Sequence, residues 1–214
     1  QSRATRMPGS FDNPQAFDIS NAQVWVQKST GFFQYYVQAG AYSIPILSVP
    51  YMKSTDTMKN SFGVLSQAYV KIAPTDNFSI KAGKIMTLFG AEYTFTFQNM
   101  NIFRGLLSNQ EQFVIRGVQA DYATGPFSFS LALTDGYYSD RWNWITGLAS
   151  WAIDPENVVS FVGGKNMGAT GPGAGVATAF VQQNSMMFNL LYTHSSGPFT
   201  STPYFQYSKV PTNL

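Results

Sequence analysis

The stretch that decides the fold is Ala123-Thr124-Gly125-Pro126, followed directly by Phe127-Ser128-Phe129-Ser130-Leu131-Ala132-Leu133-Thr134. Large apolar residues occupy every second position of its second part, and small or polar residues lie between them. Successive side chains of a β-strand point to opposite faces, so this alternation predicts a strand with one apolar and one polar face. The Gly-Pro pair before it predicts a tight turn from a preceding strand.

Similar alternation recurs along the chain and predicts a series of hairpins. About ten strands are expected, at Ala22–Lys28, Phe32–Tyr42, Phe62–Ala73, Phe78–Met86, Phe113–Ala123, Phe127–Gly136, Trp142–Ile153, Val158–Asn166, Gln183–His194 and Phe199–Val210. Short turns are expected around Thr30, Asp76, Gly125, Pro155 and Gly197, and longer connections join the other strand ends. All the short turns therefore fall on one side of the predicted sheet.

The composition indicates which kind of sheet this is. Charged residues make up only 11% of the 214 residues and aromatic residues 16%, whereas ordinary soluble domains are about 25% charged. No run approaches the roughly 18 apolar residues that a spanning helix needs, and a closed barrel is the other structure that satisfies its backbone in lipid. The sequence predicts one domain over residues 1–214, an all-β antiparallel transmembrane barrel of which these strands are the whole or a part.

Tyr and Trp residues near the predicted strand ends are expected at the level of the lipid headgroups, where an amphipathic ring is favoured. They are Tyr35, Tyr36, Tyr42, Tyr137, Tyr138, Trp142, Trp144, Tyr192 and Tyr204.

Several function classes receive no support from the residues. The 13 basic and 11 acidic residues are spread along the chain without a basic stripe, so nucleic acid is not an expected partner. With no cysteine and a single histidine, His194, the chain offers no metal-ligand spacing, and it has no Gly-x-Ser-x-Gly motif. We expect no enzyme, no metal and no cofactor. The glycine-rich Met167–Gly175 lacks the Gly-Lys-Ser/Thr ending of a phosphate loop and is predicted to be a mobile connection.

The most distinctive local motif is Gly83-Lys84-Ile85-Met86-Thr87-Leu88-Phe89-Gly90-Ala91-Glu92. It resembles the glycine-lysine strand end and following glycine-glutamate loop of the bacterial OmpL-like, or porin-2, family of β-barrel porins. Further matching features are Asn99, Asn101, Arg104, Arg116-Gly117-Val118-Gln119 and Pro203-Tyr204-Phe205-Gln206-Tyr207. The resemblance implies a passive pore in the bacterial outer membrane.

In such barrels the connection after the glycine-lysine strand folds into the lumen, and here that connection is Thr87–Gln112. The alternative is a solvated cap outside the barrel. Opposed charges at a constriction sort solutes by charge, and the candidate pore or constriction residues are Lys71, Lys81, Lys84, Glu92, Arg104, Glu111, Arg116, Gln119 and Asp121. Strand parity places Gln119 and Asp121 on the polar face and Arg116 on the apolar face.

The function expected from these features is passive diffusion of small hydrophilic solutes or ions through a water-filled barrel. Two alternatives stay open: a structural, adhesive or scaffold barrel without an open pore, and a soluble carbohydrate-binding sandwich. The expected partners are outer-membrane lipid, including lipopolysaccharide, the permeant solutes, and further copies of the chain, as in a trimer, or other envelope proteins.

Overall fold

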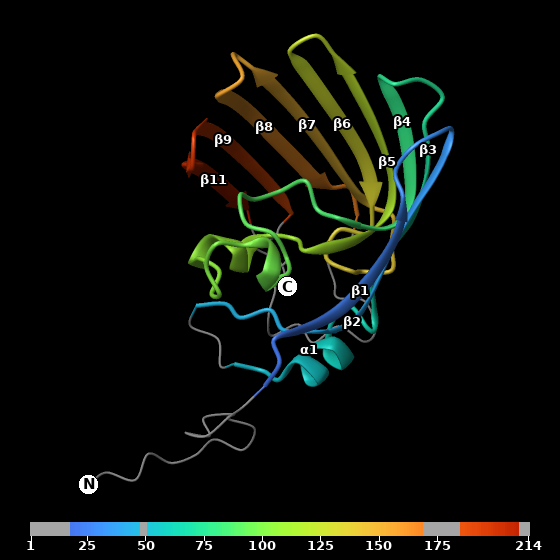
Figure 1. The fold of residues 1–214 in the computed structure, drawn as a ribbon, viewed down its shortest axis with the longest axis vertical. Helices are drawn as coiled ribbons and strands as arrows, with labels where there is room; N and C mark the ends of the chain where they lie inside the picture. The colour runs from blue at the N-terminus through green and yellow to red at the C-terminus, as the bar shows by residue number, and fades with distance from the viewer. Residues whose placement is uncertain (1–17, 48–50, 169–184, 210–214) are drawn as a thin grey trace, which may run out of the picture.

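All the strands that the structure describes belong to one antiparallel sheet, which curves around a concave side (Figure 1). The computed structural model describes residues 18–47, 51–168 and 185–209. Strands follow one another in chain order, so each strand from β1 to β9 is hydrogen-bonded to the next. The strands are β1 (Asn21–Lys28), β2 (Phe33–Tyr42), β3 (Leu65–Ile72), β4 (Phe78–Met86), β5 (Val114–Thr124), β6 (Phe127–Thr134), β7 (Trp144–Ala152), β8 (Asn157–Asn166), β9 (Met186–Ser196), β10 (Phe199–Ser201) and β11 (Tyr204–Lys209).

The last predicted strand is interrupted. β10 and β11 both pair with β9, and Thr202 and Pro203 separate them. Proline has no N–H to donate to a neighbouring strand, which accounts for a break at this position. The sheet is open over the described residues, with β1 at one edge and β10 and β11 at the other. Residues 183, 184 and 210 of the predicted strands lie outside the described part of the chain, as do residues 169–175 of the predicted mobile connection.

The hairpin with its turn at Gly125-Pro126 forms as the sequence predicts. Thr124 pairs with Phe127 across the two-residue turn Gly125-Pro126, and Gly125 takes a φ of +52°. A positive φ at the first central residue suits the tight hairpin turns that match the twist of the strands, and glycine adopts it without steric cost.

The two faces of the sheet differ in chemistry. Large apolar side chains are exposed on the convex face of strand after strand, as at Val37, Ile80, Leu131, Phe161 and Phe205. Soluble monomers rarely expose large apolar side chains on one face of strand after strand. A sandwich would need a second sheet packed on the first, and the described strands form only one, so the soluble sandwich does not fit.

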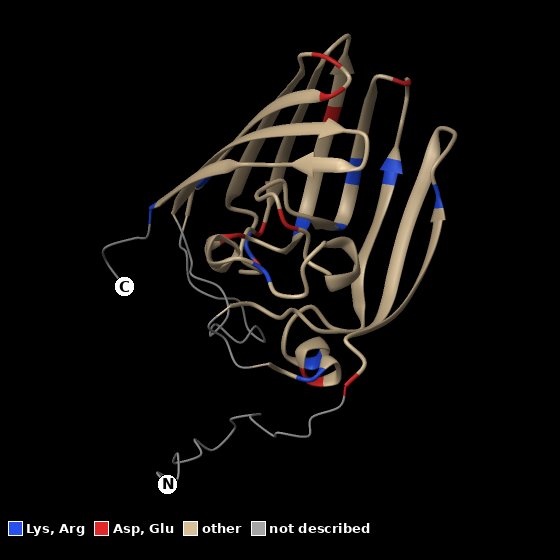
Figure 2. Cartoon of the chain, turned by 60° about the vertical axis from the view of Figure 1, so that its left-hand side comes forward, with Lys and Arg blue, Asp and Glu red and all other residues tan. Residues whose placement is uncertain are grey.

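Charged residues are rare on the strands (Figure 2). They gather at the turns, at a few strand positions and in the segments on the concave side, which matches a wall with one face in lipid. A short helix, α1 (Ser54–Asn60), which the sequence did not predict, lies next to β2 in the connection between β2 and β3. In the described ranges, none of the helices has the length and apolar content needed to cross a membrane.

Candidate functional site

Residues 87–112, which form the connection between β4 and β5 except for its last residue, lie on the concave side of the sheet, and we call them the inner segment (Figures 1 and 2). It contains two 3-10 helices, η1 (Thr96–Gln98) and η2 (Leu106–Gln110). Of the two alternatives that the sequence left open, the structure shows the inward fold, because side chains of this segment pack against concave-face residues of distant strands.

Aromatic contacts attach the inner segment to three strands. Phe97 stacks on Trp25 of β1, with ring centroids 6.0 Å apart. Phe95 meets the Tyr42 ring of β2 edge to face at 5.2 Å, and Phe89 meets the Trp144 ring of β7 at 6.5 Å. Tyr42 and Trp144 have no exposed surface. The prediction that these two residues lie at the lipid headgroups is therefore wrong.

Polar contacts attach the inner segment to β11, at the opposite edge of the sheet. Tyr204 donates its hydroxyl to Glu111 Oε1 at 3.3 Å, and Gln206 donates to the Leu107 carbonyl at 3.3 Å. Ser208 donates to Gln110 Oε1 at 3.4 Å. The inner segment thus crosses the whole concave face, from β1 and β2 to β11.

Arg104 and Glu92, two of the predicted constriction residues, hold the inner segment together. Only 1% of Arg104 is exposed, and its Nε donates to the Tyr93 carbonyl at 2.8 Å. Both carboxylate oxygens of Glu92 accept the Gly105 N–H, at 2.9 and 3.1 Å. Burial lowers the pKa of Arg104 to about 10, and the nearby Glu92 opposes that shift. Both side chains are engaged with backbone groups.

Glu111 is the third charged candidate in this segment and is also 1% exposed. Burial raises its pKa to about 7; the negative charge of Glu92 adds to the rise, and the hydrogen bond from Tyr204 opposes it. A carboxyl group with this pKa changes its charge near neutral pH. The protonation of Glu111 therefore changes with pH near neutrality.

A second group of candidates lies on the wall, on the concave faces of β4 and β5. Lys81 Nζ is 3.5 Å from Asp121 Oδ2, and Asp121 Oδ1 accepts hydrogen bonds from Gln119 at 2.6 Å and Ser130 at 2.7 Å. Lys81 also lies over the Tyr69 ring, 5.9 Å from its centroid. The structure therefore brings three predicted residues, Lys81, Gln119 and Asp121, into one network.

The cavity next to this network lies toward the short turns and has a volume of about 790 Å³. Its lining includes Gln34, Lys71, Ser79, Asp121 and Ser130. Lys71 pairs in register with Lys81 across β3 and β4, which puts both side chains on the concave face. The concave face between the turns and the inner segment consequently carries polar groups with both signs of charge.

Lys84 and Arg116 do not lie with these wall residues. They pair with each other across β4 and β5 and have the opposite parity to Lys81 and Gln119, so they project from the other face. Lys84 Nζ donates to the Phe62 carbonyl and, at 2.7 Å, to that of Leu65. Arg116 donates to Asp135 at 2.6 Å and to Asp140. Both side chains bond to residues beyond the strand pairing, and neither contributes to the charged network of the concave face.

The functional residues that sequence reasoning missed are the wall contacts of the inner segment, chiefly Trp25, Tyr42 and Trp144. Their aromatic character was visible, but only the fold shows that they meet residues far away in the sequence. In the part of the chain that the structure describes, acidic and histidine side chains form no group of three that could hold a metal ion. His194 lies near the turn after β7, with Nδ1 2.9 Å from Asn157 Oδ1.

An antiparallel sheet with an apolar convex face, a polar concave face and an inward-folded connection has the architecture of a β-barrel porin wall. The chain belongs to the family described as putative β-barrel porin-2, OmpL-like, whose model matches residues 1–214. Neither the search of curated proteins nor the search of solved structures gives a match.

Proposed function

We propose that this protein is a passive porin of the bacterial outer membrane, which lets small hydrophilic solutes or ions diffuse along the concave face of its sheet. One observation carries the proposal: a continuous sheet with an apolar convex face bears a polar, charged concave face crossed by the inner segment. In a barrel wall the convex face meets lipid and the concave face meets water. Membership of a porin family supports the same assignment.

The asymmetry of the connections gives the orientation that we propose. In outer-membrane barrels the short turns are periplasmic and the long loops extracellular. The turn at Gly125 would then face the periplasm, and the inner segment would narrow the extracellular half of the passage. A wall in lipid cannot leave backbone groups unpaired, so in the membrane we expect both open edges of the sheet to be paired.

The mechanism that we propose involves no chemical step. Solutes pass the wall charges Lys71, Lys81 and Asp121, which favour or disfavour ions by sign. The inner segment sets the upper size of the solute, because it is attached at both edges of the sheet. Protein groups act only through their charge and the volume that they occupy.

Planar-bilayer recording tests the proposal. Folded protein, identified by its heat-dependent migration on a gel, is expected to give discrete conductance steps in KCl. A variant in which residues 91–109 are replaced by a short Gly-Ser linker should still form the sheet, with lower stability because the packing of Phe95 on Tyr42 is lost, and should give steps several-fold larger. Folded protein that gives neither conductance nor liposome swelling would overturn the porin assignment.

A second candidate function, a barrel that serves as a scaffold without an open pore, is favoured by the packing of the inner segment. Phe95, Arg104 and Glu111 are almost completely buried, so this part of the concave side is filled by protein. If the linker variant conducts and the natural protein does not, the scaffold assignment replaces the porin assignment.

A further inference from the structure

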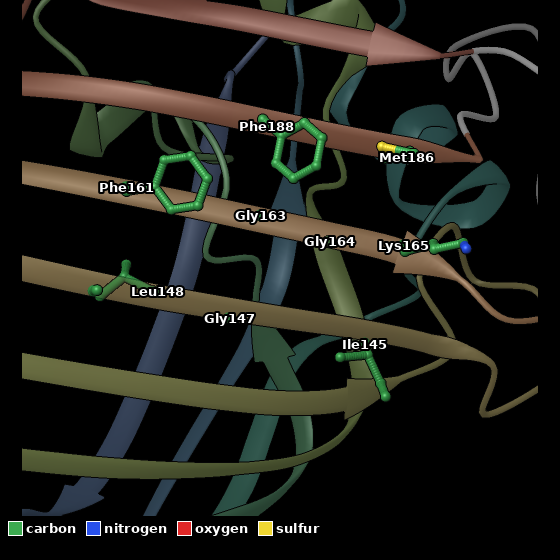
Figure 3. Close-up of a pocket in the computed structure, with 10 residues that line it drawn as sticks. Ile145, Gly147, Leu148, Phe161, Gly163, Gly164, Lys165, Met186 and Phe188 are labelled. Carbon is green, nitrogen blue, oxygen red and sulfur yellow. The ribbon is translucent and has the colours of Figure 1, made fainter.

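The convex face of the sheet carries an apolar groove over β7, β8 and β9 (Figure 3). Its volume is about 540 Å³, which lies in the range of about 300–1,000 Å³ typical of ligand sites. The groove exists because Gly147 and Gly163 are cross-strand partners, so two neighbouring strands lack side chains at the same height. A Cβ at position 147 would have no heavy atom within 4 Å.

Aromatic rings form the side of this groove. Phe161 and Phe188 stack with centroids 6.0 Å apart, and Phe188 stacks in turn on Tyr207 of β11 at 6.3 Å. Figure 3 shows the two phenylalanine rings side by side, with Ile145 across the groove and the glycine positions between them. A shallow, apolar channel of this kind fits a hydrocarbon chain.

Two lysines stand beside the end of the groove that is next to the long connections. Lys165 lies near the end of β8 and pairs with Met186 of β9, and Lys209 of β11 pairs with Met186 from the other side. Both lysines therefore project from the convex face, two strand spacings apart, or about 10 Å. Both are exposed, and among the described residues no carboxylate forms an ion pair with either of them.

We infer that this groove is a binding site for a phosphorylated lipid of the outer leaflet, with an acyl chain over Gly147 and Gly163 and a phosphate at Lys165 and Lys209. The inference rests on the proposed membrane location and orientation, which put the long connections and these two lysines at the outer surface. Charge complementarity selects the lipid: two unpaired cations at headgroup height attract a phosphate group.

A second copy of the chain is the competing occupant, and the same charges argue against it. Two copies related by a two-fold axis along the membrane normal have each residue at the same height in the membrane. A self-complementary interface centred on this groove would therefore place Lys165 and Lys209 of one copy opposite the same lysines of the other copy. Like charges facing each other are unfavourable.

The test is retention of lipid by the folded protein in mild detergent, measured by native mass spectrometry with added lipopolysaccharide. We expect binding to fall by about tenfold for Lys165→Ala and again for Lys209→Ala, because each loses one charge-assisted contact. Gly147→Leu fills the groove at a position with free space and should also abolish retention. Lys28→Ala, which removes a convex-face lysine beside a short turn, is the matched control and should bind like the natural chain.

Retention unchanged in Gly147→Leu and in the double lysine variant would overturn the inference. So would equal binding of the same lipid after its phosphates are removed. A change of oligomeric state in Gly147→Leu without a change in lipid retention would assign the groove to a subunit interface instead. If the protein retains lipid but gives no conductance, the lipid site is supported and the porin proposal is overturned. If it conducts but retains no lipid, the porin proposal is supported and the lipid site is overturned.

Discussion

The carboxylate of Glu111 occupies the place where a side chain on residue 90 would begin. A Cβ built on Gly90 would lie 2.1 Å from Glu111 Oε2, and Gly90 takes a φ of +85°. One end of the inner segment thus closes over the other, and a glycine is required at position 90 both for its conformation and for the space it leaves.

Gly90→Ala should loosen the inner segment. The new methyl group collides with Glu111 and the backbone conformation becomes strained, so we expect a loss of about 1–3 kcal/mol in the free energy of unfolding. Single-channel recordings should show larger and noisier steps. Gly63→Ala is the matched control, because Gly63 also has a positive φ, +73°, but a Cβ there meets nothing within 4 Å. Equal effects of the two substitutions would mean that contact with Glu111 is unimportant.

Acidification should tighten the inner segment. Burial raises the pKa of Glu111 to about 7, above the ordinary value of about 4.3. The folded protein therefore binds a proton more tightly than the unfolded chain does, so this stabilisation is complete below about pH 4 and is lost as the pH rises through 7. We expect conductance to rise between pH 6 and pH 8, and Glu111→Gln to remove that change. An unaltered pH profile in Glu111→Gln would assign the titration to another group.

Lys84→Met should destabilise the sheet at the point where the pairing of β3 with β4 ends. The β3–β4 pairing ends at Ala68 and Lys84, and Lys84 Nζ satisfies two carbonyls beyond that point. The Phe62 carbonyl is partly buried, and leaving it without a donor costs about 1–3 kcal/mol, measurable by denaturant unfolding in detergent. The Leu65 carbonyl is at the exposed end of the strand, where water replaces the lost donor. Lys81→Met, on the opposite face of the same strand, breaks a partly exposed ion pair and should cost less than about 1 kcal/mol. Similar losses for both lysines would contradict these assignments.

Lys71→Glu should shift the ion selectivity toward cations. Lys71 lines the cavity by the short turns, and reversing its charge changes the field along the passage without breaking the ion pair of Lys81. The reversal potential in a KCl gradient should move by an amount equivalent to a several-fold change in the permeability ratio. Lys28→Glu makes the same change on the convex face and should leave the reversal potential where it is. An identical shift in both variants would place Lys71 outside the passage.

The period-two pattern predicted the sheet well, because alternation is a local property of each strand. The hairpin at Gly125 forms as expected, and the parity argument that separates Asp121 from Val118 holds in the structure. The same parity argument, applied to β4, would have placed Lys84 and Lys81 on opposite faces of the sheet. Lys84 was predicted as a pore candidate, although its strand position points away from the concave face.

The contacts of the inner segment could not be read from the sequence. Phe97 and Trp25 are far apart along the chain, and no local pattern reports that they stack. Arg104 and Glu111 were predicted to face water because charged residues in loops usually do. Burial against Phe113 and Tyr204 depends on the curvature of the whole sheet, which no single segment encodes.

Attachment of the inner segment to both β1 and β11 has a consequence for how the molecule assembles. Phe97 stacks on Trp25 of β1, and Glu111 accepts a hydrogen bond from Tyr204 of β11, which are the first and last of the described strands. These contacts have very long sequence separation, and such contacts form late because their loop-closure entropy is lost before they stabilise anything. The narrowing of the passage is therefore expected to be the last part of the protein to fold, so an incompletely inserted sheet would be a wider and leakier one.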